Sequence, residues 1–295
     1  MLEEKKKDKI LSKFDLFKKY NKLKNKNSTG ATLGNVVSTK EKRNTVRYSK
    51  GRNRKFIFYL IPFCSGEIIM NERIIDYIGE ENFRKIENAK VLLIGLGGVG
   101  GYTFEALVRS GIKFITVIDF DIFENSNFNR QIYATIDTLN KNKAQIAALR
   151  ASKINPEAKI TCLDKKLSQD DITKDFVTEY DYILDACDDT LVKVELMKAC
   201  ALYHVKLISC MGTANRMCPE MLEITSLKKT FNDPLAKKIR MLLKGNSKAL
   251  QTKVVWSREV PKKQKKLGTL CMTPMSAGSL LASFVIRDIL ETEKE

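Results

Sequence analysis

A glycine-rich turn between two apolar segments is the feature that most constrains how this chain can fold. Residues 91–94 are all apolar, a pattern typical of a buried parallel strand, and residues 114–118, apolar except for Thr116, predict a second buried strand. Between them lie a G-x-G-x-x-G sequence at 95–100 and a helical apolar pattern. Asp119 follows the second segment directly. This order predicts a strand–turn–helix–strand unit that binds a nucleotide.

Each part of this unit has a chemical role in the predicted nucleotide site. The glycines are Gly95, Gly97, Gly98 and Gly100. They let backbone N–H groups approach a phosphate at the positive end of the following helix. Asp119 can accept hydrogen bonds from ribose hydroxyls. Glycines in this pattern can also serve tight packing alone, but the flanking strands and helix favour the nucleotide site.

The positive charge of the chain is concentrated near its amino terminus. The 295 residues include 52 Lys and Arg and 35 Asp and Glu, a net charge of +17. Residues 1–69 hold 18 basic and 6 acidic residues, and the remainder holds 34 and 29. The first 69 residues therefore carry +12 and the rest only +5. A Lys-, Asn- and Ser-rich composition predicts a basic, disordered extension over 1–69.

Two other interpretations of this extension stay open. It can be an RNA-binding basic arm, or an artefact of a gene model extended too far upstream. Met70 begins a sequence that resembles a natural protein start, and Gly66-Glu67 can be encoded by a string like a ribosome-binding site. We expect the folded part of the chain to begin at Met70.

Cysteine and histidine usage argues against a metal or disulfide scaffold. The seven cysteines form no C-x-x-C pair, and His204 is the single histidine. A tetrahedral zinc site needs four clustered ligands, so we expect no zinc. We interpret the chain as a reduced, cytoplasmic protein. No apolar run reaches the length of a membrane span, so no transmembrane segment is expected.

Strand and helix patterns alternate through the first part of the predicted fold. Helices are predicted over 70–89, 141–154, 169–178 and 191–203, and further strands over 158–163, 180–186 and 205–210. This alternation predicts an α/β fold with a doubly wound, mostly parallel, Rossmann-like sheet. Ligands then bind beyond the carboxyl ends of the strands.

The alternation fades after Gly212. We expect a strand over 222–227, a basic helix over 234–244, a strand over 253–256 and an apolar helix over 276–290. This irregular part is the elaborated, substrate-binding portion of the predicted fold.

Three polar residues extend the predicted nucleotide site. Arg130, in an Asn-Arg-Gln loop, can bind phosphate oxygens with its forked guanidinium. Lys143 can direct its charge at the same phosphates. Asp188, at a predicted strand end, can bind phosphate-associated Mg²⁺. Each also has an ordinary alternative role: a solvated loop arginine, a surface lysine and a helix N-cap.

Together these motifs resemble the ubiquitin-activating-enzyme-like adenylyltransferases, the ThiF/MoeB/HesA superfamily. The matching segments are G-L-G-G-V-G at 95–100, I-D-F-D at 118–121, N-x-N-R-Q at 127–131, Lys143, I-N-P at 154–156 and D-A-C-D-D at 185–189. The resemblance runs from about residue 71 to residue 290. It implies ATP and Mg²⁺ as cofactors and a doubly wound sheet.

The resemblance also implies roles for individual residues. Asp119 binds the ribose, Arg130 and Lys143 hold the ATP phosphates, and Asp188 binds Mg²⁺. The motif residues Asp121 and Asn129 join the nucleotide-binding candidates. Members of the superfamily are commonly homodimers in which an amino-terminal arginine reaches the partner's phosphates, and Arg73 stands at that place here.

Later motifs resemble one branch, the tRNA threonylcarbamoyladenosine dehydratases. They are M-G-T-A-N at 211–215, N-D-P-L-A at 232–236 and V-V-W-S-R-E at 254–259. The resemblance implies ATP-dependent cyclisation of the threonylcarbamoyl group on the adenosine beside the anticodon. Some members carry a cysteine where this chain has Val254, so an obligatory thioester there is not expected. Whether a sulfur-transfer partner takes part stays open.

This branch gives the basic surface residues a purpose. Lys237, Lys238, Arg240, Lys262 and Lys263 are candidates for contact with tRNA phosphates. A solvated charged face is the ordinary alternative.

The implied organisation is an ATP-binding adenylating domain over 70–295. It comprises a nucleotide-binding core at 89–211, a tRNA-facing part at 212–275 and a packing helix at 276–290. Three rival functions remain: adenylation of the carboxyl terminus of a ubiquitin-like or sulfur-carrier protein, nicotinamide-dependent oxidation, and a non-catalytic nucleotide-binding adaptor.

Overall fold

The computed structural model describes residues 45–49, 55–59 and 71–291, in two compact units, 1–68 and 69–295. In the first unit, strands β1 (Thr45–Ser49) and β2 (Lys55–Tyr59) pair antiparallel. Both are rich in the β-branched and aromatic residues that favour strands. This hairpin lies within the segment whose composition predicts disorder. The rest of that prediction falls on residues outside the described part of the chain.

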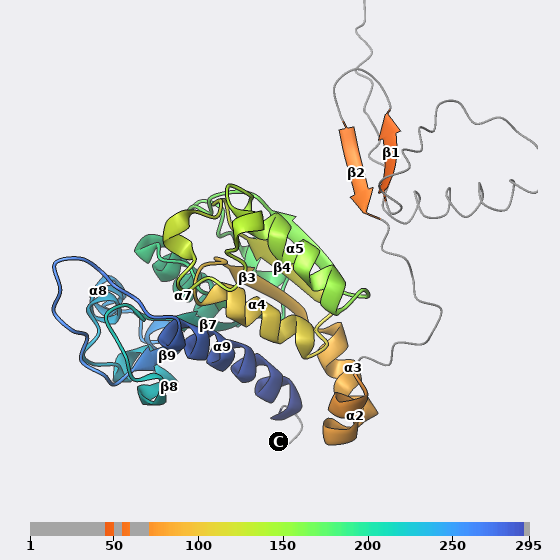
Figure 1. The fold of residues 1–295 in the computed structure, drawn as a ribbon. Helices are drawn as coiled ribbons and strands as arrows, with labels where there is room; N and C mark the ends of the chain where they lie inside the picture. Colours follow the sequence, from red (N-terminus) through yellow and green to blue (C-terminus); the bar gives the residue numbers. More distant parts are fainter. Residues whose placement is uncertain (1–44, 50–54, 60–70, 292–295) are drawn as a thin grey trace, which may run out of the picture. The chain divides into compact units, whose positions relative to one another are not determined.

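A seven-stranded sheet forms the centre of the second unit, in the order β5-β4-β3-β6-β7-β9-β8 (Figure 1). The strands are β3 (Lys90–Ile94), β4 (Phe114–Ile118), β5 (Lys159–Leu163), β6 (Tyr182–Asp185), β7 (Lys206–Cys210), β8 (Leu222–Ser226) and β9 (Lys253–Ser257). Neighbours are parallel except β8, which runs antiparallel to β9. The predicted doubly wound, mostly parallel sheet is confirmed.

Helices cover both faces of this sheet. They are α2 (Glu72–Ile78), α3 (Glu80–Asn88), α4 (Gly100–Arg109), α5 (Lys143–Ile154), α6 (Lys174–Thr178), α7 (Thr190–Tyr203), α8 (Pro234–Leu242) and α9 (Met272–Glu291). Residues of α4, α5 and α9 join one buried cluster, and residues of α6, α7 and α8 join the other. Alternate residues of β3 belong to the two clusters, so this strand lies between two cores.

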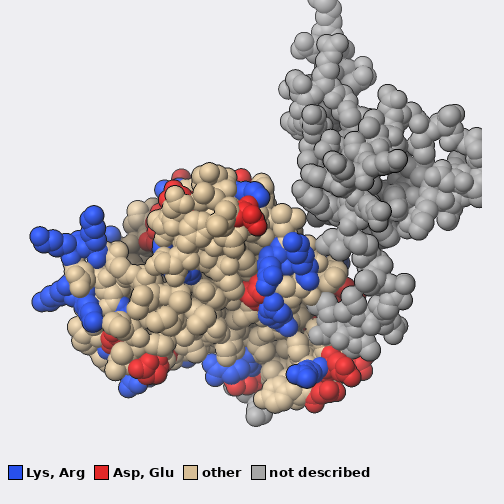
Figure 2. Space-filling view, viewed as in Figure 1, with Lys and Arg blue, Asp and Glu red and all other residues tan. Residues whose placement is uncertain are grey.

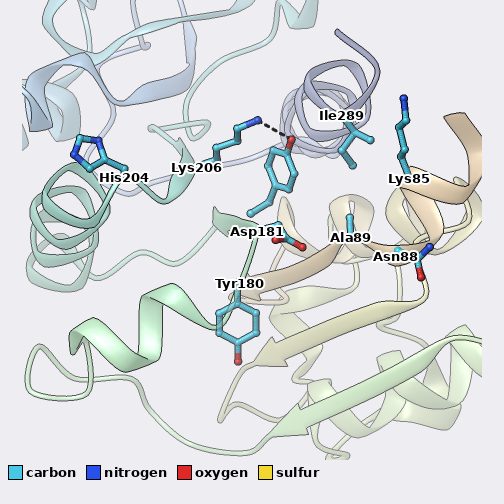
Figure 3. A pocket seen from close by; sticks show the side chains of 9 residues that line it. Lys85, Asn88, Ala89, Tyr180, Asp181, His204, Lys206 and Ile289 are labelled. Carbon is cyan, nitrogen blue, oxygen red and sulfur yellow. Dashed lines mark hydrogen bonds between the residues drawn. The ribbon is translucent and has the colours of Figure 1, made fainter. Parts of the chain in front are cut away.

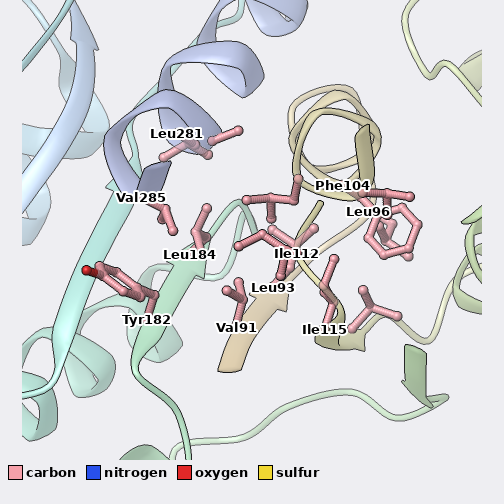
Figure 4. Close-up of a cluster of buried hydrophobic side chains, with 14 of the residues drawn as sticks. Val91, Leu93, Leu96, Phe104, Ile112, Ile115, Tyr182, Leu184, Leu281 and Val285 are labelled. Carbon is pink, nitrogen blue, oxygen red and sulfur yellow. The ribbon is translucent and has the colours of Figure 1, made fainter. Parts of the chain in front are cut away.

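The first core packs the glycine-rich turn against the sheet (Figure 4). Leu93 of β3, Phe104 of α4 and Leu281 of α9 are fully buried in it. Removing a large side chain from such a core typically costs about 2–5 kcal/mol. The position of the turn is therefore set by packing on both sides of β3.

Helix α9 approaches α4 very closely at Gly278. A Cβ atom there would lie 2.5 Å from the Val99 carbonyl oxygen and 3.0 Å from the Thr103 amide nitrogen. The Thr103 hydroxyl donates a 3.2 Å hydrogen bond to the Gly278 carbonyl. Glycine is required because the backbones of the two helices meet with no room for a side chain.

Three predicted helices differ from those observed. The helix predicted over 70–89 is two helices separated at Gly79, whose φ of 80° interrupts the helical backbone. The helix predicted near 169–178 is only α6, because the Thr173 side chain caps it by accepting a hydrogen bond from the Phe176 amide. Helix α9 starts before residue 276 because Pro274 is tolerated in a first turn.

Candidate functional site

The turn after β3 can be built only from glycine at two positions. Gly95 has φ of +88°, and a Cβ atom there would lie 2.9 Å from the Ala186 carbonyl oxygen. A Cβ atom at Gly100 would lie 1.8 Å from the Gly95 carbonyl oxygen. A Cβ atom at Gly97 would meet nothing within 4 Å. Gly95 and Gly100 therefore close the turn, and Gly97 leaves open space beside the cleft.

A cleft of about 1150 Å³ opens at the carboxyl ends of β3, β4, β6 and β7. Its basic lining residues are Arg130, Lys143, Lys165, Lys166, Arg216, Lys262 and Lys263. Its acidic lining residues are Asp119, Asp121, Asp188, Asp189 and Asp233. Gly95, Gly97 and Gly98 also line it. An excess of basic groups around a few carboxylates suits a polyphosphate with its counterion.

Asp119 fastens the glycine-rich turn to β4. Its carboxylate accepts a 2.6 Å hydrogen bond from the Leu96 amide and a 2.8 Å bond from the Asp121 amide. Burial raises the pKa of Asp119, while these two hydrogen bonds and the Lys143 charge act in the opposite direction. Each carboxylate oxygen keeps a second lone pair. Asp119 can thus hold the turn and still accept a ribose hydroxyl.

Lys143 is a buried cation at the start of α5. Its side chain is 6% exposed, and its ammonium group lies 2.9 Å from the Asp121 carboxylate. Asn142 caps the helix by accepting a hydrogen bond from the Gln145 amide. The ammonium group keeps further donor capacity, because an ammonium has three N–H groups. Asp121 therefore orients Lys143 at the rim of the cleft.

Arg130 lies over the glycine-rich turn. A Cβ atom at Gly98 would be 3.3 Å from Arg130 Cγ. The guanidinium donates to the Ser126 carbonyl at 2.6 Å and to the Asn129 side chain at 3.0 Å. Asn129 in turn donates to the Thr269 carbonyl at 2.8 Å. Asn129 thus ties the arginine loop to the segment before α9.

The two aspartates that follow β6 have different roles. Asp189 caps α7 by accepting hydrogen bonds from the Leu191 and Val192 amides. The neighbouring Asp188 is exposed, and within the described part of the chain its carboxylate has no hydrogen-bond or ion-pair partner. The capping role that the sequence left open belongs to Asp189. Asp188 is consequently available to a ligand.

A buried ion pair supports the turn between β6 and α7. Lys193 is fully buried, and its ammonium group donates to Asp185 at 2.9 Å, to the Ser209 hydroxyl at 3.2 Å and to the Cys210 carbonyl at 2.9 Å. The other Asp185 oxygen accepts a 3.1 Å bond from the Cys187 amide. Burial, the largest single effect, lowers the pKa of Lys193, but the charge and hydrogen bond of Asp185 together with the nearby Cys187 and Cys210 outweigh it, so the pKa is raised.

A second buried ion pair organises the far side of the cleft. The Arg216 guanidinium lies 3.1 Å from Asp233, and both side chains are almost fully buried. Arg216 also donates to the carbonyls of Gly212 and Glu259. Asp233 caps α8 by accepting from the Ala236 amide at 2.9 Å. The pair joins the loop after β7, the start of α8 and the end of β9.

Asn215 holds the lysine loop, residues 261–268, beside the cleft. Its side chain accepts a 2.7 Å hydrogen bond from the Gly268 amide, and its own amide donates to the Gly268 carbonyl at 2.7 Å. The Asn215 carbonyl accepts from the Lys262 amide at 2.9 Å. Asn215 has φ of 58°, a left-handed conformation that asparagine tolerates. One residue thus binds both ends of the loop.

The tRNA-binding candidates fall in two places. Lys262 and Lys263 are exposed on the lysine loop and line the cleft. Lys237 and Lys238 are exposed on α8, whereas Arg240 is half-buried and donates a hydrogen bond to the Thr230 hydroxyl. Figure 2 shows lysine and arginine side chains gathered at the end of the unit formed by α8 and the loop after β9.

Two predicted features lie away from this cleft. Arg73 is exposed on α2, before the amino end of β3, and does not line the cleft. His204 has φ of 57° at the end of α7 and lines another cleft, of about 570 Å³, at the amino ends of β3, β6 and β7 (Figure 3). There the Lys206 ammonium donates to the Tyr182 hydroxyl at 3.2 Å. The single histidine is thus remote from the glycine-rich turn.

Several residues of the main cleft were absent from the sequence-based candidates. Lys165 and Lys166 follow β5, so the rule that ligands lie at carboxyl ends of strands could have identified them. Arg216 directly follows the M-G-T-A-N motif, but its pairing with Asp233 depends on the fold. No spacing in the sequence indicates that pair.

Neither a metal cluster nor a membrane span is found in the described residues. Within 45–49, 55–59 and 71–291, no group of three or more His, Cys, Asp or Glu side chains is placed to hold a metal ion. Over the same ranges, no helix has both the length and the apolar character needed to cross a membrane.

Comparisons with known proteins identify relatives of the whole second unit. A model of the ThiF family matches residues 70–294. The tRNA threonylcarbamoyladenosine dehydratase of Bacillus subtilis is 31% identical over 233 residues, covering 72% of this chain and 92% of that protein. The Escherichia coli enzyme of the same name is 34% identical over 206 residues, covering 68% of this chain and 77% of that protein.

A solved structure agrees with these relatives. The crystal structure of the E. coli tRNA N6-threonylcarbamoyladenosine dehydratase in complex with ATP matches with a TM-score of 0.73 and 30% sequence identity. The match covers 79% of this chain and 98% of that chain. The similarity therefore includes the sheet, both helical layers and the irregular part after β7.

Proposed function

This chain belongs to the ThiF family, and we propose that it is an ATP-dependent tRNA threonylcarbamoyladenosine dehydratase. The observation that carries the proposal is a single cleft lined by the glycine-rich turn, Arg130, Lys143 and the lysine loop. A nucleotide site and a basic RNA-facing surface then share one opening. Relatives of that name match most of the chain, and one was solved with ATP.

The proposed reaction has two steps. The threonylcarbamoyl carboxylate attacks the α-phosphorus of ATP, which forms an acyl–adenylate and breaks the bond to pyrophosphate. A nucleophile within the same modified base then attacks the activated carbonyl, and AMP leaves as the ring closes. The second step is intramolecular, so holding the reactants in position supplies much of its acceleration.

The cleft residues would stabilise charge on the triphosphate. Arg130 can turn its forked guanidinium from the Ser126 carbonyl to phosphate oxygens. Lys143 adds a buried point charge, which acts more strongly there than in water. Backbone N–H groups of Gly97, Gly98 and Gly100 would face the phosphates, whereas the Gly95 amide already donates to the Ile118 carbonyl at 2.9 Å. Asp119 accepts a ribose hydroxyl.

Asp188 is the residue we assign to Mg²⁺. Its exposed carboxylate lines the cleft and is not used by the helix cap, which belongs to Asp189. Hard oxygen ligands of this kind suit a magnesium ion shared with substrate phosphates. When bound, the ion neutralises charge on the phosphates. Asp121 is less suited because it already pairs with Lys143.

Calorimetry tests the nucleotide assignment. We expect ATP with Mg²⁺ to bind and NAD to have no measurable affinity. In steady-state kinetics, Arg130→Ala should lower kcat while leaving tRNA affinity nearly unchanged, because Arg130 would contact charge that develops on the triphosphate. Lys153→Ala, at an exposed lysine of α5 that does not line the cleft, is the control for loss of a cation. NADH binding without ATP binding would exclude adenylation.

Docking of tRNA is assigned to the exposed lysines. Neutralising Lys237 and Lys238 to glutamine should raise the KM for tRNA and reduce the salt dependence of binding by about one phosphate contact per lysine. The kcat at saturating tRNA should stay unchanged. A protein that starts at Met70 should be measured beside the full chain, because residues 1–69 carry +12 and can bind RNA nonspecifically.

We further propose a cytoplasmic homodimer in which Arg73 reaches the partner's nucleotide. Its distance from the cleft of its own chain supports action across an interface, since α2 precedes the amino end of β3. Mixing Arg73→Ala with Asp188→Ala should then restore part of the activity that each variant lacks. A fully active monomer would contradict this assignment. A sulfur-transfer partner protein remains an additional proposal.

One assay distinguishes the proposed function from its rivals. The protein is incubated with ATP, Mg²⁺ and threonylcarbamoylated tRNA, and the nucleosides are analysed by mass spectrometry. Loss of one water from the modified nucleoside is the expected result. ATP–pyrophosphate exchange that requires a ubiquitin-like protein instead would favour the carrier-protein rival, and no turnover with either substrate would favour an adaptor.

A further inference from the structure

The turn that leads into α8 presents an aromatic ring to solvent. Phe231 is 49% exposed, and its ring packs edge-to-face on the buried Trp256 with centroids 4.6 Å apart. The Trp256 indole donates a 2.7 Å hydrogen bond to the Phe231 carbonyl. Single exposed apolar residues are common on protein surfaces. Phe231 differs from the other exposed apolar residues in the hydrogen bonds that hold its turn and in the basic residues of its segment.

Every residue of the turn is anchored. The Thr230 hydroxyl donates to the Leu227 carbonyl at 2.8 Å. The Asn232 carbonyl accepts from Arg216 at 3.3 Å, and Asp233 pairs with the same guanidinium at 3.1 Å. The ring of Phe231 therefore stands on a rigid mount. Because the ring is already held in place, binding a flat ligand against it would cost the protein little conformational entropy.

The segment of the chain that contains Phe231 is strongly basic. Between residues 224 and 257 the chain has eight basic residues: Lys228, Lys229, Lys237, Lys238, Arg240, Lys244, Lys248 and Lys253. Asp233 is the sole acidic residue in that range, and it is buried against Arg216. No ion pair among the described residues involves any of the seven lysines. This charge favours a polyanionic partner.

The ring also lies close to the nucleotide cleft along the chain. Asp233, Pro234 and Leu235 line the cleft, and Phe231 is two residues from the first of them. Proteins that recognise single-stranded RNA loops combine basic surfaces with aromatic side chains that stack on splayed bases. The segment that contains Phe231 has both features, and it continues directly into residues that line the proposed nucleotide cleft.

We propose that Phe231 stacks on an unpaired anticodon-loop base adjacent to the modified adenosine, while the surrounding lysines contact phosphates. This inference rests on the proposed function, because it takes the substrate to be tRNA. Stacking would fix the neighbouring base and so direct the modified adenosine into the cleft. Phe231 is a binding residue in this scheme and takes no part in the chemistry.

The test uses the full chain and a fluorescent anticodon stem-loop RNA that carries threonylcarbamoyladenosine. Phe231→Ala and Phe231→Leu should raise the Kd by about 5- to 140-fold, and Phe231→Tyr should bind like wild type. The slope of log Kd against log salt should not change in these variants, because stacking releases no counterions. Neutralising Lys237 and Lys238 should flatten that slope.

Met241→Ala is the matched control, since Met241 is 70% exposed on α8 in the same basic region. It should leave the Kd unchanged. The proposal is overturned if Phe231→Leu binds RNA normally, if Met241→Ala weakens binding equally, or if Phe231→Leu also loses ATP binding and thermal stability. A wild-type protein that does not cyclise the nucleoside would instead contradict the proposed function and leave the RNA-binding result interpretable by itself.

Discussion

The Lys193 ammonium group lies 2.9 Å from the Asp185 carboxylate, and neither side chain is exposed to solvent. The pair sits where β6 ends, three residues before Asp188. Through its second oxygen, Asp185 holds the Cys187 amide at 3.1 Å. The buried Lys193 charge thereby fixes, through Asp185, the position of the turn that carries Asp188, the proposed magnesium ligand.

Replacing Lys193 by methionine should be strongly destabilising. It leaves Asp185 as a buried charge without its counter-ion, which typically costs about 3–5 kcal/mol in the free energy of unfolding. The double change Lys193→Met with Asp185→Asn should cost less because no unpaired charge remains. Chemical denaturation measures both. Lys198→Met, on the same helix with a 44% exposed side chain, is the control. An equal loss in the single and double variants would contradict this account.

The two glycines Gly97 and Gly100 should respond differently to alanine. At Gly97 a methyl group fits the free protein but intrudes on the cleft, so Gly97→Ala should fold normally and weaken ATP binding. At Gly100 a Cβ atom would lie 1.8 Å from the Gly95 carbonyl oxygen, so Gly100→Ala should lower the melting temperature. Thermal melting and ATP calorimetry on both variants test this. Normal ATP affinity in Gly97→Ala would exclude phosphate contact there.

Asn215→Gly should loosen the lysine loop. Glycine keeps the backbone hydrogen bonds and the left-handed conformation but loses the side-chain bond to the Gly268 amide. Losing a hydrogen bond worth about 0.5–1.5 kcal/mol should make tryptic cleavage at the loop lysines about two- to twelve-fold faster in the variant than in wild type. Asn215→Asp keeps an acceptor and should be cleaved like wild type. Cleavage of the glycine variant at the wild-type rate would show that the bond does not restrain the loop.

Glu105 should make the fold sensitive to acid. Its carboxylate is 10% exposed and accepts hydrogen bonds from Arg150 and Tyr133. Burial would raise its pKa, but hydrogen bonds from Arg150 and Arg109 outweigh burial, so the pKa lies below its ordinary value of 4.5. The unfolded chain therefore takes up this proton first, and the stability that Glu105 contributes is present above pH 4.5 and lost as the pH falls below it.

Denaturation at several pH values checks this contribution. Glu105→Gln should be less stable than wild type near pH 7, and the difference should shrink as the pH falls below 4.5. Glu81→Gln is the control, because the Glu81 side chain is 86% exposed. A difference between Glu105→Gln and wild type that stays constant down to pH 3 would assign the effect to packing rather than to charge.

Much of the fold could be predicted because its signals are local. Four apolar residues in β3, followed by a glycine-rich turn, and four in β4, followed by Asp119, mark buried strands. The order of strands and helices then gives the doubly wound sheet and the edge that carries ligands. The break at Gly79 was missed because a single glycine is compatible with a continuing helix.

The candidate site was less accessible to prediction where it depends on long-range pairs. Arg216 and Asp233 are separated by seventeen residues and meet only when the start of α8 lies beside the loop after β7. Asn215 closes a loop with Gly268, fifty-three residues away. Asp188 and Asp189 have the same side chain, and only the direction in which α7 leaves β6 decides which one caps the helix.

The close approach of α9 to α4 has a consequence for synthesis of the chain on the ribosome. The glycine-rich turn lies at residues 95–100, whereas the helix that packs against α4, the helix after this turn, is α9. At Gly278 of α9 a Cβ atom would lie 2.5 Å from the Val99 carbonyl oxygen. A nascent chain that has not yet released α9 from the exit tunnel leaves that face of α4 uncovered. Any nucleotide binding at this turn should therefore begin only after α9 has left the tunnel and packed against α4.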